Sequence, residues 1–405
     1  MSYALIDAEV TALADVTLEE SQDGIALLLR HRGRPIHYSL HGFDAGSRIA
    51  AAQLWELVGK YAGADLLAQA IRDELAPAPP PRPLSITAAI CTHARTDLLA
   101  RCLESLLKAK ATGPDSVHLD VLVVDNSPPD DSTRQLVASF ETVRYALEPR
   151  PGLDFGRNRA VAEGRGEYLA FLDDDVVVDS RWLHGLSEAL SENPDAGAVT
   201  GLVLPAELVT KAQIDFERRG GFRRGTRKLR YHGDTQPGNA LYPTGAGIFG
   251  AGCNMVLRRE LVQKLGGFDE ALDTGPPLPG GGDLDIFYRV VRSGEPLVYE
   301  PRMLVFHRHR PDHQALRRQY WSWGDGFMAY VAKTYGTDIA ARPKLRALVL
   351  WWSRYALRQV AAGVKRRDRE SLDLSVAELV GGVTGLGGSY GRSRKRTQEI
   401  RDAHA

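Results

Sequence analysis

The stretch Tyr168-Leu169-Ala170-Phe171-Leu172-Asp173-Asp174-Asp175 runs from a short apolar segment straight into three carboxylates. A short apolar run bounded by polar residues predicts a buried strand. Side chains alternate along a strand, so Asp173 and Asp175 are expected on one side of its end and Asp174 on the other. Two converging carboxylates suit a hard divalent cation, which prefers oxygen ligands and also takes phosphate oxygens. A solvated acidic turn is the alternative interpretation.

Strand and helix patterns alternate upstream of this stretch. Two more short strands are predicted at Ser85–Cys91 and Leu119–Val124. Helical spacing occurs at Asp97–Lys108, Ser132–Phe140 and Gly156–Glu163. Alternation of this kind predicts an α/β fold with a Rossmann-like, mostly parallel sheet.

Polar residues follow each of the three predicted strands. Thr92-His93-Ala94-Arg95 comes after the first strand, Asp125-Asn126-Ser127 after the second, and Asp173–Asp175 after the third. Ligands of such sheets bind beyond the carboxyl ends of the strands. The sequence therefore predicts one binding site built from these three segments.

The chain divides into four regions. The run Ala76-Pro77-Ala78-Pro79-Pro80-Pro81-Arg82-Pro83 predicts a semi-rigid linker over residues 76–83. Before it, residues 1–75 predict a small α+β module, with β-like runs at Gly24–Leu29 and Pro35–Leu40 and a helix from about Ser47 to Leu75. The core domain spans 84–335, and 336–405 is a basic, helical region.

The C-terminal region is strongly amphipathic over Leu345–Val364 and carries basic clusters. One interpretation is a pair of helices that packs on the core. The other is an interfacial helix, with Trp351 and Trp352 at the lipid headgroups and basic residues facing anionic lipid.

Composition narrows the classes of function. The 405 residues contain 51 Lys and Arg against 51 Asp and Glu, so no bulk charge favours nucleic acid. The three cysteines form no CxxC pair, which is typical of reduced thiols in a cytosolic protein. No signal peptide and no apolar run of membrane-spanning length is evident. We expect a cytoplasmic protein, or one peripheral at the inner face of a membrane.

Further segments downstream complete a recognisable order. These are Pro151-Gly152-Leu153-Asp154-Phe155-Gly156-Arg157-Asn158-Arg159-Ala160, then 250–259, Gly266-Gly267-Phe268-Asp269-Glu270, 280–289 and Val305-Phe306-His307. With the strand ends above, they resemble family-2 glycosyltransferases of the GT-A fold over about Leu84–Thr334.

The resemblance implies a nucleotide-sugar donor. Thr92 and Arg95 would border the base, and Asp125 would contact it, usually as uracil, which implies a UDP-linked sugar. Arg157 and Asn158 would lie near the diphosphate at a helix N-terminus, where an arginine suits phosphate. Other donor-binding positions implied are Asp173, Asp174 and Asn254. The acceptor, whether a glycan, a lipid-linked molecule, a peptide or a small molecule, is not indicated.

The resemblance also implies a metal site and a catalytic base. Asp173 and Asp175 would form the DxD motif that holds Mn²⁺ or Mg²⁺, with His307 preferred over His309 as a third ligand. Members of the family have a Glu-Asp pair whose Asp is the general base of an inverting displacement. Here Gly282 replaces the Glu, so the assignment rests on Asp283. Asp285 is the alternative base, and a helix-capping role for Asp283 is also open.

Two other functions are alternatives to a glycosyltransferase. An apolar strand followed by Asp-x-Asp also resembles the nucleophile motif of haloacid-dehalogenase phosphatases, with Asp173 as nucleophile. That motif normally opens its domain, whereas two strand–helix units precede it here. The other alternative is a sugar-nucleotide-binding protein without catalysis. Trp321 and Trp323 are expected to pack in the core or line an acceptor wall.

Overall fold

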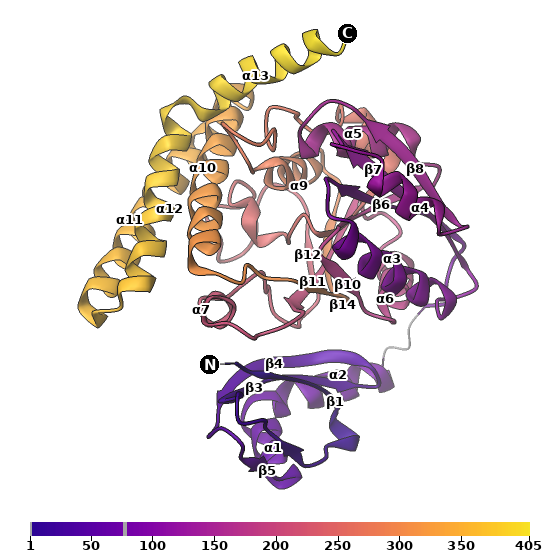
Figure 1. Cartoon of the computed structure of the whole chain (residues 1–405), viewed down its shortest axis with the longest axis vertical. Coiled ribbons are helices and arrows are strands. Elements are labelled where there is room, and N and C mark those ends of the chain that lie inside the picture. Colours follow the sequence, from indigo (N-terminus) through magenta and orange to yellow (C-terminus); the bar gives the residue numbers. More distant parts are fainter. Residues whose placement is uncertain (1, 76–78) are drawn as a thin grey trace.

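A computed structural model describes residues 2–75 and 79–405 of the chain. It has a small N-terminal module, a central α/β domain and an arm of long helices along one side (Figure 1). Part of the predicted linker, residues 76–78, lies outside the described residues, and 79–83 form no helix or strand.

The module is built around strand β3. β3 (Gly24–His31) pairs in parallel with β1 (Ala4–Glu9) and in antiparallel fashion with β4 (Arg34–Gly42). The predicted hairpin turn is present, with positive φ at Arg32 and Gly33. The helix predicted from Ser47 starts later, at α1, because β5 pairs with β2. The other elements here are β2 (Val16–Thr17), β5 (Arg48–Ile49), α1 (Ala51–Leu57), a π turn (Val58–Ala62) and α2 (Gly63–Leu75).

The central domain contains a nine-stranded sheet in the order β10-β14-β11-β13-β9-β6-β7-β8, with β12 on β14. Its strands are β6 (Leu84–Thr92), β7 (Val117–Asn126), β8 (Val143–Glu148), β9 (Tyr168–Asp173), β10 (Val176–Val178), β11 (Ala198–Pro205), β12 (Leu229–Tyr231), β13 (Asn254–Arg258) and β14 (Leu297–His307). The half around β6 is parallel, as predicted, and places Thr92 opposite Asp125 and Cys91 opposite Asp173.

The other half of the sheet is mixed. β13 lies antiparallel between β9 and β11, and its first residue, Asn254, pairs with Leu172 near the carboxyl end of β9. β13 therefore starts at the edge where the parallel strands end. The preceding loop, residues 250–253, is delivered to the predicted site for that reason.

Helices cover both faces of the sheet. One face packs against α3 (Thr96–Ala111), α4 (Ser132–Ala138) and α6 (Trp182–Glu192). The other packs against α5 (Leu153–Glu163), α8 (Arg259–Lys264) and α9 (Gly282–Arg292). A shorter helix, α7 (Lys211–Arg218), lies outside these layers, between the sheet and the arm.

The C-terminal arm consists of packed helices, as one interpretation expected. Its elements are α10 (His313–Thr337), α11 (Arg342–Arg366), α12 (Arg369–Thr384), a π turn (Gly385–Ser389) and α13 (Tyr390–Ala403). α12 packs along both α10 and α11. Trp352 is 6% exposed and packs on Gly382 and Phe327, so its expected place at lipid headgroups is wrong, whereas Trp351 is 52% exposed. Within the described parts of the chain, no helix combines the length and apolarity needed to cross a membrane.

Candidate active site

Three side chains meet where strands β9, β10 and β14 come together. Asp173 ends β9, Asp175 immediately precedes β10, and His307 ends β14. β10 and β14 are antiparallel, with Val176 opposite His307, and this register brings His307 beside Asp175. One ligand atom from each of the three residues lies within 4.8 Å of the others.

Burial and mutual repulsion dominate the electrostatics of this cluster. Burial, reinforced by the Asp175 carboxylate, raises the pKa of Asp173 to about 7, and burial also raises the pKa of Asp175. Burial lowers the pKa of His307. Asp175 Oδ1 lies 3.3 Å from His307 Nε2 and has no hydrogen-bond partner among the described residues. Two carboxylates and an imidazole fit a divalent cation such as Mn²⁺.

Asp174 points away from this cluster, as the strand alternation predicts. It accepts a hydrogen bond from Thr92 Oγ1 at 2.7 Å and forms an ion pair with Arg95 at 3.1 Å. Thr92 is 3% exposed and its hydroxyl holds Asp174, and its place beside a nucleotide base stays a prediction. The Arg95 guanidinium is more open and also lies 3.7 Å from Asp175.

Asp125 ends up fully buried at the end of β7. Its Oδ2 accepts a hydrogen bond from the Tyr145 hydroxyl at 2.9 Å, while its Oδ1 has no partner among the described residues. Burial raises the pKa of Asp125. The free oxygen is suited to an N–H donor.

Arg157 lies deeper than expected for a phosphate-binding residue. It is 4% exposed and forms ion pairs with Asp154 at 2.9 Å and Asp273 at 3.4 Å, so its charge is already balanced. A Cβ added to Gly252 would lie 3.0 Å from both Arg157 and Asp283, which places these residues together. Arg157 therefore neutralises carboxylates behind the site.

The two asparagines expected at the donor are hydrogen-bonded within the fold. Asn158 donates to the Phe268 carbonyl at 3.0 Å and accepts from the Phe268 N–H at 2.8 Å, so it holds the turn at 266–270. Asn254 is fully buried and accepts from Trp182 Nε1 at 2.9 Å while its amide donates to backbone carbonyls of β11 and β14. Both side chains use their hydrogen-bonding groups within the fold.

The two candidate bases differ in their surroundings. Asp283 is the second residue of α9, is half-buried, and accepts a hydrogen bond from the Gly252 N–H at 3.1 Å. The helix cap is Gly281, so Asp283 is not the cap. Asp285 is 1% exposed and paired with Arg289 and Lys333, which excludes it as a base for an external substrate.

Sequence reasoning missed Asp154. This carboxylate is fully buried, and burial raises its pKa. Its Oδ2 lies 2.1 Å from the position that a Cβ on Gly282 would take. Asp154 thus fills the space in which the side chain of residue 282 would stand. The signal was present in the sequence, as a glycine at 282 combined with an acid three residues before Arg157.

Comparison with known proteins decides the family. Residues 87–266 match the model described as "Glycosyl transferase family 2". These residues, which make up much of the central domain, belong to glycosyl transferase family 2. The central domain of this family-2 glycosyltransferase has the α/β class expected from its sequence, and the protein is a sugar-transferring enzyme.

Several curated relatives are similar over more than half of this family-2 enzyme. The succinoglycan biosynthesis protein ExoM of Rhizobium meliloti is 28% identical over 242 residues, which cover 58% of this chain and 70% of ExoM. The glucosyl-dolichyl phosphate glucuronosyltransferase of Haloferax volcanii is 21% identical over 56% of this chain and 69% of its own length. Among solved structures, a mannosyltransferase of Pyrobaculum calidifontis in complex with GDP-Man and Mn²⁺ matches with a TM-score of 0.48 and 17% identity, over 82% of this chain and 97% of the other.

Proposed function

We propose that this glycosyltransferase uses a nucleoside-diphosphate sugar and a divalent cation, Mn²⁺ or Mg²⁺, held by Asp173, Asp175 and His307. The observation that carries the proposal is the convergence of these three ligand atoms within 4.8 Å. Asp175 Oδ1 and His307 Nε2, 3.3 Å apart, are spaced as two neighbouring ligands of one small ion are. When bound, the cation would supply positive charge that stabilises the departing diphosphate.

Asp283 is the proposed general base. Its Oδ2 already accepts from the Gly252 N–H, and it lies in the first turn of α9. In the reaction the acceptor hydroxyl loses its proton to Asp283 as its oxygen bonds to the anomeric carbon. The bond from that carbon to the diphosphate oxygen breaks, and the diphosphate keeps the electron pair. Attack opposite the leaving group inverts the anomeric configuration.

Uracil is the proposed base of the donor. Asp125 Oδ1 is a buried acceptor without a partner in the described chain, and the uracil ring offers an N–H donor. An unpaired buried acceptor is costly, so a base that donates to it gains binding free energy. Guanine also offers N–H donors, and the experiment below separates the two.

The first experiment is a thermal-shift and donor-hydrolysis screen of nucleotide sugars, with and without Mn²⁺. We expect stabilisation by UDP-sugars that requires metal and that disappears in Asp175→Ala. Asp195→Ala, which removes a mostly exposed carboxylate paired with Arg230, is the control and should keep the shift. No shift with any donor, together with phosphate release from simple phosphomonoesters, would contradict the proposal in favour of a phosphatase using Asp173.

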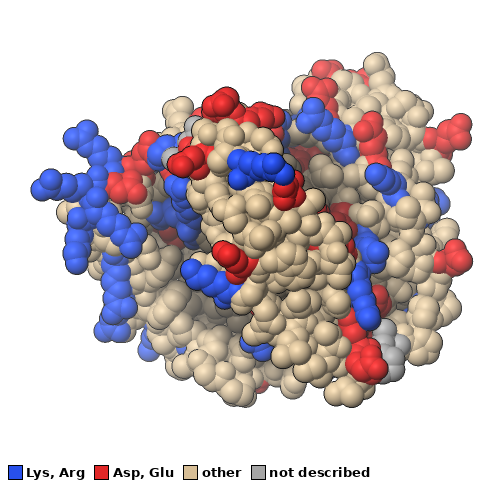
Figure 2. Space-filling view, turned by 90° about the horizontal axis from the view of Figure 1, so that it is seen from below, with Lys and Arg blue, Asp and Glu red and all other residues tan. Residues whose placement is uncertain are grey.

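We also propose that the arm contacts an anionic membrane surface. The outer side of α11 exposes Leu350, Trp351 and Leu357, each more than half exposed, alongside Arg354 and Arg358. Figure 2 shows Lys and Arg side chains gathered at the left edge, where α11 ends and α12 begins. Apolar side chains interleaved with cations suit the interface of an anionic bilayer. One relative is named for a dolichyl-phosphate-linked substrate, a lipid.

Vesicle co-sedimentation tests the membrane contact. We expect binding to vesicles rich in phosphatidylserine, weakened by salt, and lost in Trp351→Ser combined with Leu357→Ser. Trp55→Ser is the control, because Trp55 is similarly exposed, at 47%, but lies in the N-terminal module. Failure of the unmodified protein to bind anionic vesicles would remove the proposal.

A further inference from the structure

A second histidine and a buried glutamate stand behind His307. We propose that His309 and Glu217 are positioning residues that fix the proton of His307 on Nδ1 and so leave Nε2 free to bind the cation. This inference rests on the metal site proposed above. Glu217 belongs to none of the motifs from which the site was predicted, and His309 entered that prediction only as the less favoured third ligand.

The contacts form a continuous buried chain. Glu217 Oε1, in the last turn of α7, lies 2.9 Å from His309 Nε2. His309 Nδ1 lies 3.1 Å from His307 Nδ1, and His307 Nε2 faces Asp175 Oδ1 at 3.3 Å. The exposed fractions are 0% for Glu217, 2% for His309 and 5% for His307, so water does not compete for these bonds.

Donor and acceptor chemistry sets the order of protons along the chain. Arg223 Nε lies 3.2 Å from Glu217 Oε2, and a carboxylate paired with a guanidinium only accepts hydrogen bonds. His309 therefore donates from Nε2, and in the neutral ring its Nδ1 is an acceptor. His309 Nδ1 therefore accepts a hydrogen bond from the N–H at Nδ1 of His307. The Nε2 of His307 then presents a lone pair to the metal site.

Packing holds both rings in the orientation that the chain requires. Phe216 and Phe222 contact His309 and His307 edge-on, at ring-centroid distances of 4.7 and 5.0 Å. At the far end the module covers Glu217 with Tyr38, whose buried hydroxyl has a pKa raised by burial and by the Glu217 carboxylate. The docked module thus keeps water away from Glu217, the residue that fixes the direction of the hydrogen bonds running to His309 and His307.

The opposite proton order has a different chemical consequence. If His307 carried its proton on Nε2, the N–H would donate to Asp175 Oδ1 and occupy the place of the cation. His309 would then have to donate from both ring nitrogens and carry a positive charge. The two arrangements are distinguishable on the unmodified protein.

Nuclear magnetic resonance of the full chain with ¹⁵N-labelled histidine reads the tautomers directly. We expect Nδ1–H on His307 and Nε2–H on His309, without metal and with diamagnetic Mg²⁺. Nε2–H on His307 in the presence of Mg²⁺ would overturn the inference. This measurement needs no variant, so it holds even where a substitution prevents folding.

Calorimetric titration of the donor-free protein with Mn²⁺ supplies the second readout. Glu217→Leu should weaken Mn²⁺ binding by about 10- to 100-fold, and Glu217→Gln, which keeps an acceptor, by less. Glu300→Gln is the matched control, because Glu300 is equally buried, at 1% exposure, but lies near the start of β14 and pairs with Arg302. Unchanged affinity in folded Glu217→Leu, or an equal loss in Glu300→Gln, would overturn the inference. Wild-type protein that binds no Mn²⁺ would contradict the metal site itself.

Discussion

Asp283 and Asp285 lie two positions apart in α9 and are expected to fail in different ways when changed. Asp283→Asn keeps an acceptor for the Gly252 N–H but cannot take a proton, so we expect kcat to fall by about 10²- to 10⁴-fold with stability preserved. Asp285→Ala strands the buried cations of Arg289 and Lys333, so we expect a loss of about 3 kcal/mol in unfolding free energy. Steady-state kinetics and urea unfolding measure both variants. A catalytic loss in Asp285→Ala at full stability would reassign the base.

Substitutions at Asp154 and Gly282 are expected to have coupled effects on stability. The Asp154 carboxylate occupies the space that a side chain at residue 282 would need. Gly282→Ala places a Cβ within 2.1 Å of Asp154 Oδ2 and should cost about 1–3 kcal/mol. In an Asp154→Ala background the same change should be neutral or stabilising, since alanine favours a helix over glycine by about 1 kcal/mol. A double-mutant cycle by urea unfolding measures the coupling. Additivity within about 0.5 kcal/mol would contradict it.

At the scale of elements, α10 and α12 approach closely because glycines face each other across the contact. A Cβ on Gly324 would lie 2.0 Å from the Glu378 carbonyl oxygen, and one on Gly381 would lie 2.0 Å from the Trp321 carbonyl oxygen. We therefore expect Gly324→Ala to lower the unfolding free energy by about 1–3 kcal/mol. Gly336→Ala, in the same helix with open space around it, should raise it by about 0.5–1 kcal/mol.

Thermal and urea unfolding of Gly324→Ala and Gly336→Ala measure these two effects on stability. Equal effects at both positions would show that the helices can move apart at little cost. The glycines of α12 also show how a sequence pattern can point to the wrong secondary structure. Glycines at 381–382 and 385 look like a loop signal, yet α12 runs through the first two and uses them for packing.

The elements that sequence predicted well are those whose signal is local. The strand that ends at Asp173 and the polar residues after β6 and β7 follow from apolar runs of strand length, and the structure confirms them. The antiparallel insertion of β13 was not predicted, since strand direction within a sheet depends on contacts far apart in the chain. For the same reason, the structural roles of Thr92, Asn158 and Asn254 emerged only when their distant partners were in place.

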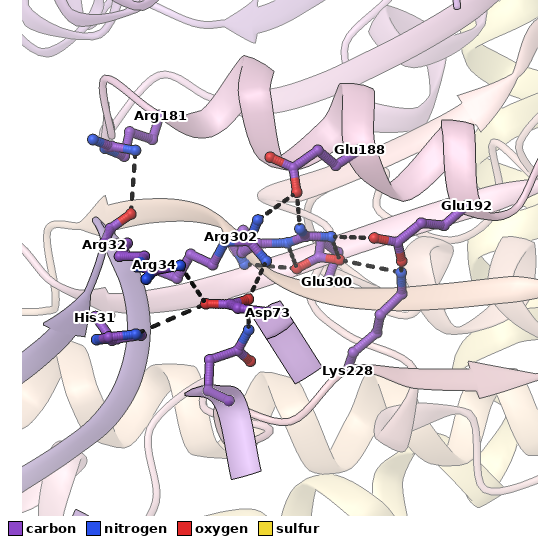
Figure 3. Close-up of polar contacts among 11 residues, drawn as sticks. His31, Arg32, Arg34, Asp73, Arg181, Glu188, Glu192, Lys228, Glu300 and Arg302 are labelled. Carbon is purple, nitrogen blue, oxygen red and sulfur yellow. Dashed lines mark hydrogen bonds and ion pairs between the residues drawn. The ribbon is translucent and has the colours of Figure 1, made fainter. Parts of the chain in front are cut away.

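At the scale of the whole molecule, the module docks on the central domain through an apolar centre with a charged rim. Strand β3 is buried on both faces, which its unbroken run of apolar residues indicates. Leu28 packs against Leu202, Leu204 and Leu304 of the central sheet. Around this centre, Arg34 of the module and Arg302 of β14 both reach Glu188 of α6 (Figure 3). Two hollows of about 350 and 450 Å³ open among these charges, and neither is lined by Asp173, Asp175 or Asp283.

The sizes of the free-energy contributions predict whether the apolar centre or the charged rim holds the module on the central domain. Leu28 is 3% exposed, so Leu28→Ala should cost about 2–5 kcal/mol, whereas partly exposed pairs such as Arg34 with Glu188 are worth about 0–1 kcal/mol. We expect Leu28→Ala to increase the radius of gyration in small-angle X-ray scattering. It should also speed exchange of the Tyr3 amide, which donates to the Leu208 carbonyl across the junction. Glu188→Gln should change neither, even at high salt. The reverse pattern would make the charged rim the anchor, and the module would then be released by salt alone.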